Sequence, residues 1–302
     1  MLRRTFLGAA LCGAVSAQSR FSRPPDRANI PYGPSNRTVL DLWQAPSATP
    51  TPLVIYFHGG EYVAGDKSNL NPGLLDGLLA AGISVAAINF RYAFEFAQYP
   101  FTTHDPTRAV QFLRLSAPDW NLDPERFGAT GVSSGGTMAL WIGLHDDIGD
   151  PKKADPVLRQ STRLSAVAVQ DAQTTYDPRV LDKLIGPTVF QDPSMETLFG
   201  YSLHRQRNQA ALNVFTDASP ANHLSDDAPP VLLLYSEPDT PLPADAKPGA
   251  GLHHPRFGYY LKERMDARGI ECSVVVLDKP GMHPTAAEQT VAFFKRHFGA
   301  HH

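Results

Sequence analysis

The chain has few cysteines and no cysteine and histidine spacing typical of a metal site. Its two cysteines, Cys12 and Cys272, cannot form a disulfide framework, and we expect no metal ion and no cofactor. Eleven histidines are present, two pairs of them adjacent. Because adjacent residues do not share one face of a helix, we expect His253-His254 and His301-His302 to be solvated loop histidines.

Charge is also scarce. Charged residues make up 19% of the chain, and the formal net charge is −3 at pH 7. No basic stripe and no phosphate-binding loop is visible, so we expect no nucleic-acid partner. Few charges together with 42% apolar residues are typical of a domain whose strands are buried on both faces.

Long hydrophobic runs are missing as well. The apolar stretch at residues 8–15 is too short to span a bilayer, and we expect no stable membrane anchor. Paired arginines precede it, and Val15-Ser16-Ala17 resembles a signal-peptide cleavage site. We therefore predict a signal peptide over residues 1–17, with export to the periplasm or the cell exterior. The run Arg-Arg-Thr-Phe-Leu resembles a twin-arginine signal. An uncleaved, frayed terminus is the alternative.

After cleavage, Cys272 would be the sole cysteine, so the mature chain would hold no internal disulfide. Residues 18–36 are rich in Arg, Pro, Ser and Asn and predict an irregular linker.

Residues 37–300 alternate apolar, strand-like runs with amphipathic, helix-like segments, which predicts one α/β domain. We expect a doubly wound, mostly parallel sheet. Strands are expected at 38–43 (an edge strand), 53–57, 83–90, 126–130, 164–169, 231–235 and 272–277. Helices are expected at 70–81, 105–116, 138–144, 255–268 and 285–297.

Residues 171–222 interrupt this alternation without long periodicity, and we interpret them as an inserted, lid-like segment or pocket wall. Its candidate wall residues are large and mostly apolar: Tyr176, Phe190, Met195, Leu198, Phe199 and Tyr201. A short helical patch that packs on the edge of the sheet is the alternative.

The most informative motif is Gly131-Val132-Ser133-Ser134-Gly135, which lies between a strand-like and a helix-like run. A G-x-S-x-G sequence in that setting is typical of a nucleophile elbow, in which a sharp turn presents the serine hydroxyl. Glycines flank the serine because a Cβ there would collide with neighbouring backbone. Ser133 is therefore the candidate nucleophile, and Ser134 a small residue that opens the following helix.

Further candidates follow other predicted strands in an informative order. His58-Gly59-Gly60-Glu61 follows the strand at 53–57 and can aim backbone N–H groups at an oxyanion. Asp239 follows the strand at 231–235, and His283 follows the strand at 272–277. The chain order of oxyanion loop, serine, aspartate and histidine is that of α/β-hydrolases. An imidazole can take the serine proton, and a carboxylate can orient the imidazole.

These motifs resemble those of α/β-hydrolase esterases related to hormone-sensitive lipase and to acetyl and feruloyl esterases. The resemblance covers roughly residues 35–298 and is carried by HGGEYVAGDKS, NLDPERFGATGVSSGG, SPANHLSDDAPPVLLLYSEPD and HHPRFGYYLKERMDARGIECSVVVLDKPGMHP. It implies a catalytic triad of Ser133, Asp239 and His283. It further implies an oxyanion hole from the N–H groups of Gly60, Glu61 and Ser134, with His58 and Gly59 orienting the loop.

Two acidic residues compete with Asp239. Glu237 lies on the same loop, and Asp278 ends the strand that leads to His283. The D-T-P-L-P run that begins at Asp239 resembles the family motif and favours Asp239.

The chain departs from the family at Glu61, where a third glycine is common, and in its G-V-S-S-G-G elbow, where the family often has G-D-S-A-G-G. A carboxylate beside a developing oxyanion is unfavourable. Glu61 must therefore point away, pair with a cation such as Lys67 or Arg91, or contact the substrate.

The sequence thus predicts a serine esterase that favours short acyl chains on small-molecule or polysaccharide-linked esters. An amidase or arylformamidase-like hydrolase would use the same triad and is the main alternative. A catalytically dead binding protein is less consistent with an intact Ser133, Asp239 and His283.

Overall fold

The computed structural model describes residues 20–95, 98–186, 188–189, 191, 193–202, 205, 207–277 and 284–299. Its strands form a single eight-stranded sheet of order β1-β2-β4-β3-β5-β6-β7-β8. The strands are β1 (Arg27–Pro31), β2 (Val39–Trp43), β3 (Thr51–Phe57), β4 (Ser84–Ile88), β5 (Leu122–Val132), β6 (Ala166–Gln170), β7 (Val231–Tyr235) and β8 (Cys272–Val276). The six strands from β4 to β8 in this order are parallel, whereas β1 and β2 pair antiparallel at one edge. The predicted mostly parallel α/β sheet is confirmed.

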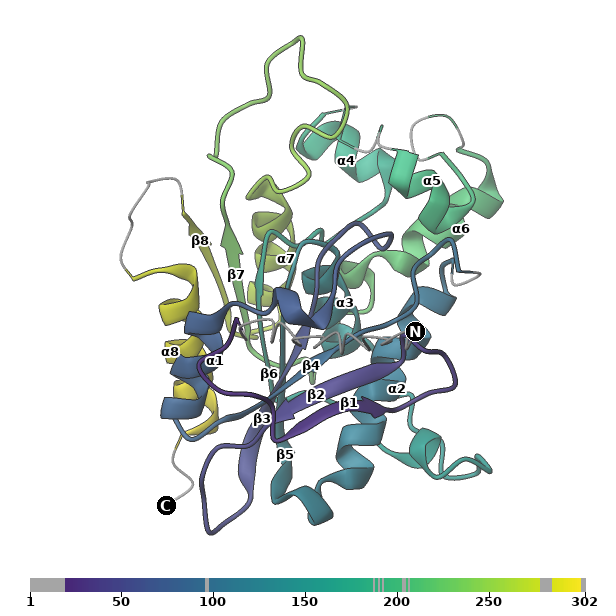
Figure 1. Cartoon of the computed structure of the whole chain (residues 1–302). Helices are drawn as coiled ribbons and strands as arrows, with labels where there is room; N and C mark the ends of the chain where they lie inside the picture. The colour runs from purple at the N-terminus through teal and green to yellow at the C-terminus, as the bar shows by residue number, and fades with distance from the viewer. Residues whose placement is uncertain are drawn as a thin grey trace, which may run out of the picture.

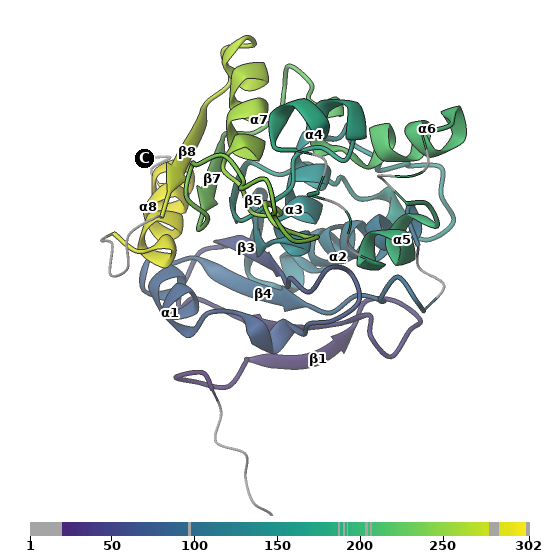
Figure 2. The same cartoon turned by 90° about the horizontal axis from the view of Figure 1, so that it is seen from above.

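Helices cover both faces of the sheet (Figures 1 and 2). The helices are α1 (Pro72–Ala80), α2 (Phe101–Ser116), α3 (Ser134–Leu144), α4 (Pro178–Leu184), α5 (Pro193–Phe199), α6 (Gln209–Ala218), α7 (Arg256–Asp266) and α8 (Ala286–Phe298). Short 3₁₀ turns lie at Lys67–Asn69, Pro118–Trp120, Val157–Arg159 and Pro220–Asn222.

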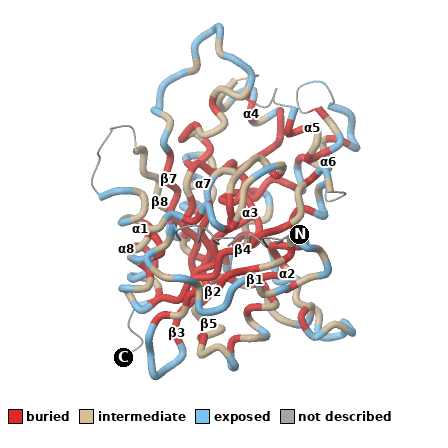
Figure 3. Tube along the Cα trace, in the orientation of Figure 1, coloured by how far each residue is buried: buried red, intermediate tan, exposed pale blue. Residues whose placement is uncertain are grey.

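The alternation of side chains along β3 builds two apolar layers. Leu53, Ile55 and Phe57 join the core that includes α2, α3 and α7, whereas Val54 and Tyr56 join the core under α1 and α8. All of β3 is buried, as expected for a central parallel strand (Figure 3).

Two sequence expectations need correction. Residues 18–36 are not an irregular linker throughout, because Arg27–Pro31 forms β1 and pairs with β2. This strand is mostly exposed and lacks an apolar pattern, so sequence periodicity could not reveal it. Helix α2 begins at Phe101, earlier than the expected start at 105. Its first residues do not extend the apolar stripe, because Phe101 is exposed and the buried Thr102 and Thr103 are polar.

The inserted segment consists of α4, α5 and α6 and connecting turns in its described part. These helices gather above the end of the sheet at which β7 finishes (Figure 1). Parallel strands point their carboxyl ends the same way, so the insertion lies on the side where the candidate catalytic residues follow their strands. Phe190, one of the expected wall residues, lies outside the described residues.

Replacement of Gly135 by alanine should destabilise the fold. A Cβ at this position would lie 2.2 Å from the carbonyl oxygen of Phe57 and 2.5 Å from that of His58. Neither backbone oxygen can move away without distorting β3, so we expect a loss of at least about 1–3 kcal/mol in the free energy of unfolding. Urea denaturation of Gly135→Ala and wild type measures the difference.

Gly73→Ala is the matched control, because Gly73 is exposed on α1 and a Cβ there would meet only the Asn71 side chain, at 3.2 Å. Alanine is the better helix former by about 1 kcal/mol, so this variant should be neutral or more stable. Equal stabilities for the two variants would show that the backbone at Gly135 has room for a side chain.

Candidate functional site

Ser133 occupies a strained turn between β5 and α3. Its φ and ψ are 53° and −123°, in a region that residues with a Cβ rarely adopt. The turn is held because the Ser133 N–H donates to the carbonyl of Gln170 at 2.9 Å, and the Thr137 N–H donates to the Ser133 carbonyl at 2.9 Å. The Ser133 residue is half-buried. This geometry is that of the expected nucleophile elbow.

The loop after β3 touches the elbow through glycines. A Cβ on Gly59 would lie 2.8 Å from the carbonyl oxygen of Val132, and one on Gly135 would collide with the end of β3. In the parallel pairing of β3 with β5, Phe57 is opposite Gly131. The absence of side chains at these glycines therefore lets the His58–Glu61 loop and the serine meet.

The backbone of this loop is left-handed at three consecutive residues. Gly60, Glu61 and Tyr62 have φ values of 118°, 53° and 65°. The Val63 and Ala64 N–H groups both donate to the Gly60 carbonyl, at 2.9 Å each, which closes the turn. Within the described residues, no hydrogen bond uses the N–H of Gly60 or Glu61, or of Ser134 at the start of α3. Such unused amides are the groups that an oxyanion hole requires.

His58 is fully buried beneath the loop and stacks on Phe90 at a centroid distance of 4.1 Å. Its Nδ1 lies 2.8 Å from the Gly59 carbonyl, which can only accept, so Nδ1 carries the proton. Its Nε2 then accepts from Arg37 at 3.5 Å. Burial lowers the pKa of His58 to about 4, and the bond to Gly59 opposes this only in part. His58 is a neutral donor to the loop.

Glu61 is half-buried and has no ion-pair partner within the described residues. The two cations considered for it are engaged elsewhere: Lys67 binds Asp41 at 2.5 Å, and Arg91 binds Asp105 at 2.8 Å. Pairing with Lys67 or Arg91 is therefore excluded. An outward orientation and contact with substrate are the two alternatives that remain.

His253 lies at the nucleophile, which corrects the expectation of a solvated loop histidine. Its Nε2 is 3.0 Å from the Ser133 Oγ. The neighbouring His254 is buried, with Nε2 2.9 Å from the Thr240 carbonyl and Nδ1 accepting from the Arg256 N–H. The expectation was wrong because it relied on the spacing of residues on a helix face. His253 and His254 lie in a loop before α7, where helix spacing does not apply.

Asp239 lies in the loop between β7 and α7, which also carries His253 and His254, and it is exposed. Burial first, and then the Asp239 carboxylate, raise the pKa of the Tyr259 phenol. Glu237 instead accepts a hydrogen bond from the backbone N–H of His253 at 3.1 Å. Asp278 and His283 lie outside the described residues, so the assignment of His283 stays a prediction from the sequence.

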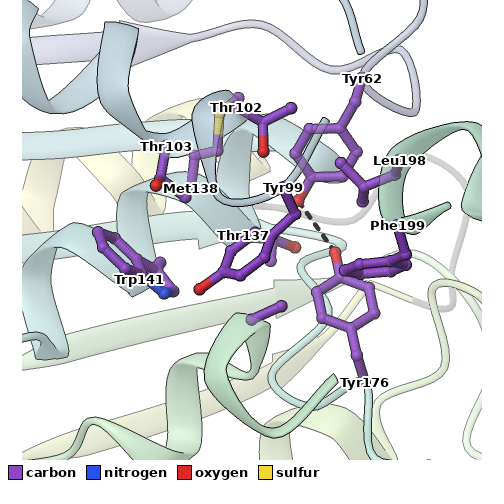
Figure 4. A pocket seen from close by; sticks show the side chains of 11 residues that line it. Tyr62, Tyr99, Thr102, Thr103, Thr137, Met138, Trp141, Tyr176, Leu198 and Phe199 are labelled. Atoms are coloured by element: carbon purple, nitrogen blue, oxygen red, sulfur yellow. Dashed lines mark hydrogen bonds between the residues drawn. The ribbon is translucent and has the colours of Figure 1, made fainter. Parts of the chain in front are cut away.

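A small cavity of about 10 Å³ lies beside the elbow helix (Figure 4). Thr137 and Met138 line it from α3, Tyr62 from the oxyanion loop, and Tyr176, Leu198 and Phe199 from the inserted segment. The hydroxyls of Tyr62 and Tyr176 are hydrogen-bonded at 2.9 Å. Residues of the inserted segment thus contribute to the lining of this cavity.

The described part of the chain contains no group of three or more His, Cys, Asp or Glu side chains arranged to hold a metal ion. Within that same part, no helix combines the length and hydropathy needed to cross a bilayer.

Comparison with known proteins places these features among esterases. The sequence model of the family described as BD-FAE matches residues 40–247. Esterase LipQ of Mycobacterium tuberculosis is 26% identical over 221 residues, which are 72% of this chain and 50% of LipQ. The chain spans about half the length of LipQ and of two other curated mycobacterial relatives that it matches.

Solved structures share the fold. A truncated carbohydrate esterase from gut microbiota has a TM-score of 0.73 at 20% identity, covering 94% of this chain and 99% of that one. An acetyl ester-xyloside bifunctional hydrolase from Caldicellulosiruptor lactoaceticus has a TM-score of 0.65 at 21% identity, covering 85% and 87%. These neighbours confirm the α/β-hydrolase fold.

The buried, neutral state of His58 predicts a pH-dependent stability. Its pKa is about 4 in the folded chain and near 6.5 when exposed by unfolding, so the stabilisation is complete above pH 6.5 and is lost as the pH falls toward 4. The loss should be on the order of 3 kcal/mol. His58→Asn keeps a donor for the Gly59 carbonyl without a titrating ring, so its unfolding free energy should fall less over this range.

Urea denaturation at a series of pH values measures both slopes. His104→Asn, which removes an exposed histidine, is the control. Parallel pH curves for wild type and His58→Asn would mean that the buried imidazole is not the cause of the acid sensitivity.

Proposed function

Because the chain belongs to the BD-FAE family, we propose that it is a serine hydrolase that cleaves carboxylic esters through an acyl-enzyme. The observation that carries the proposal is the Ser133 hydroxyl, held in a strained elbow with an imidazole nitrogen 3.0 Å away. The backbone N–H groups of Gly60, Glu61 and Ser134 make no hydrogen bond within the described residues. They belong to the loop after β3 and to the elbow, the two motifs that form oxyanion holes.

A serine hydroxyl is a weak nucleophile at neutral pH and needs a proton acceptor within hydrogen-bond distance. When Ser133 attacks the ester carbonyl, negative charge moves to the carbonyl oxygen, where fixed amides stabilise it better than mobile water does. The sequence alone predicts Asp239 as the acid that orients a base and His283 as that base, and neither role is tested by the described residues.

We further propose a preference for short acyl chains. Large side chains, among them Tyr62, Tyr176 and Phe199, line the small cavity beside α3 (Figure 4). Its volume of about 10 Å³ is about that of a single water position, so an acyl group that enters it must displace side chains. A short acyl group, such as acetyl, would require the least displacement of these buried side chains.

The natural substrate that we propose is an ester on a small molecule or on polysaccharide outside the cytoplasm. The support is the signal-like sequence at residues 1–17 and the carbohydrate-ester activities named for the two structural neighbours. Export, the twin-arginine route and the polysaccharide substrate are parts of this proposal.

Replacement of Ser133 by alanine should abolish ester hydrolysis and leave the fold intact. Alanine removes the hydroxyl that forms the acyl bond, while the Cβ and the strained backbone of the elbow remain. With p-nitrophenyl acetate as substrate, kcat should fall by about 10⁴-fold or more. Labelling by a fluorophosphonate probe should disappear at an unchanged melting temperature.

Retention of more than a few per cent of wild-type kcat by folded Ser133→Ala would refute the nucleophile. A p-nitrophenyl ester series from acetate to decanoate tests the acyl preference, which fails if decanoate is turned over as efficiently as acetate. Acetylated xylan, methyl ferulate and an aryl formamide in the same assay separate polysaccharide, phenolic and amide substrates.

Asp239→Asn should lower kcat strongly, whereas Glu237→Gln should lower it little. Asparagine cannot provide the negative charge that stabilises a protonated imidazole. Glutamine keeps an oxygen that can accept from the His253 N–H, as Glu237 does at 3.1 Å. The measurement is kcat on p-nitrophenyl acetate at constant pH. A larger loss of kcat in Glu237→Gln than in Asp239→Asn would identify Glu237 as the acid of the triad.

A further inference from the structure

The second imidazole at the nucleophile is held by hydrogen bonds on both sides of the residue. The backbone N–H of His253 donates to the Glu237 carboxylate at 3.1 Å. The carbonyl of the preceding residue, Leu252, accepts from the Gln173 side chain at 2.7 Å. The peptide units that flank the His253 Cα are thereby held by residues in the loops that follow β7 and β6.

These anchors are themselves built into the site. Gln173 is buried, and its side-chain oxygen accepts from the Thr137 hydroxyl at 3.1 Å, while its N–H donates to the same hydroxyl at 3.0 Å. Thr137 lies on α3, and its N–H donates to the Ser133 carbonyl. A continuous chain of hydrogen bonds therefore joins the nucleophile turn to the backbone that carries His253.

The loop that begins after β7 is fixed at its other end as well. The buried Asp171 carboxylate accepts from both the N–H and the hydroxyl of Ser236, at 2.7 and 2.9 Å. Gly251 has a φ of 83°, which lets the chain turn into Leu252 and His253. The position of His253 is thus defined by contacts at both ends of the loop.

We propose that His253 is a catalytic residue that accepts the proton of Ser133, an inference that rests on the proposed ester hydrolysis. An imidazole nitrogen 3.0 Å from a serine oxygen is within the reach required of a general base. No motif in the sequence indicates this role.

The step balances without any further reactant. As a lone pair of the Ser133 oxygen forms the bond to the acyl carbon, the carbonyl π pair moves to its oxygen and the hydroxyl proton moves to His253 Nε2. When the intermediate collapses, the bond to the leaving oxygen breaks, and that oxygen takes the proton from Nε2. The imidazole is neutral again when the acyl-enzyme has formed.

Two substitutions separate proton transfer from hydrogen bonding. His253→Gln keeps a polar side chain of comparable reach that cannot take a proton, and His253→Ala leaves a space for an imidazole from solution. Both should lower kcat/KM on p-nitrophenyl acetate by about 10²–10⁴-fold and slow fluorophosphonate labelling. Added imidazole should restore part of the activity of His253→Ala and none of that of His253→Gln.

Three controls accompany them. His145→Gln, on the far end of α3, should keep wild-type kinetics. His254→Gln removes a buried ring that binds the Thr240 carbonyl, so it should lower the melting temperature without rescue by imidazole. His283→Gln tests the histidine predicted from the sequence.

Wild-type kcat/KM for His253→Gln would overturn the proposal, as would a change confined to KM or a loss in His253→Ala that imidazole does not restore. If only His283→Gln lost activity, ester hydrolysis would stand and His253 would not be the acceptor. An active Ser133→Ala would refute the proposed function itself, which is a different result.

Discussion

The close approach of two backbone segments at the carboxyl ends of β3 and β5 is the constraint on which the site depends. Phe57 pairs with Gly131 in the parallel register, and the turn that follows brings Gly135 against the Phe57 carbonyl. A side chain at Gly135 would separate the helix α3 from the loop after β3. The glycines of the two motifs thus serve one purpose, because each lets the serine and the candidate oxyanion amides approach.

A buried polar framework supports the loop after the oxyanion residues. Lys67 pairs with Asp41 of β2, and its N–H donates to the Asn89 side chain at 2.6 Å. The Asn89 amide in turn donates to Asp66 at 2.6 Å. Because breaking one partner would leave a buried charge unpaired, the framework fixes the loop against the antiparallel edge of the sheet. Lys67 is engaged in this framework and therefore does not pair with Glu61.

Local requirements made much of this structure predictable. The elbow and the His58–Glu61 loop could be predicted because close backbone contacts confine them to glycine-rich sequences after apolar strands. The strand β3 could be predicted because it is buried on both faces and its sequence is therefore a continuous apolar run. His253 could not be found in this way. Its place depends on Gln173, some eighty residues earlier in the chain, and no periodicity records a hydrogen bond between two loops. The β1 strand escaped for a related reason, because its stability comes from pairing with β2 and not from an apolar face.

The two histidines near Ser133 differ in the property that decides what each can do. His58 is enclosed, and burial, with a smaller contribution from the positive charge of Arg37, lowers its pKa to about 4. A ring held neutral in this way can orient a loop but cannot carry a proton at neutral pH. His253 is half-buried and turns its Nε2 to the reacting oxygen. Burial therefore assigns the imidazole roles: the enclosed ring shapes the oxyanion loop, and the half-buried ring faces the hydroxyl whose proton must move.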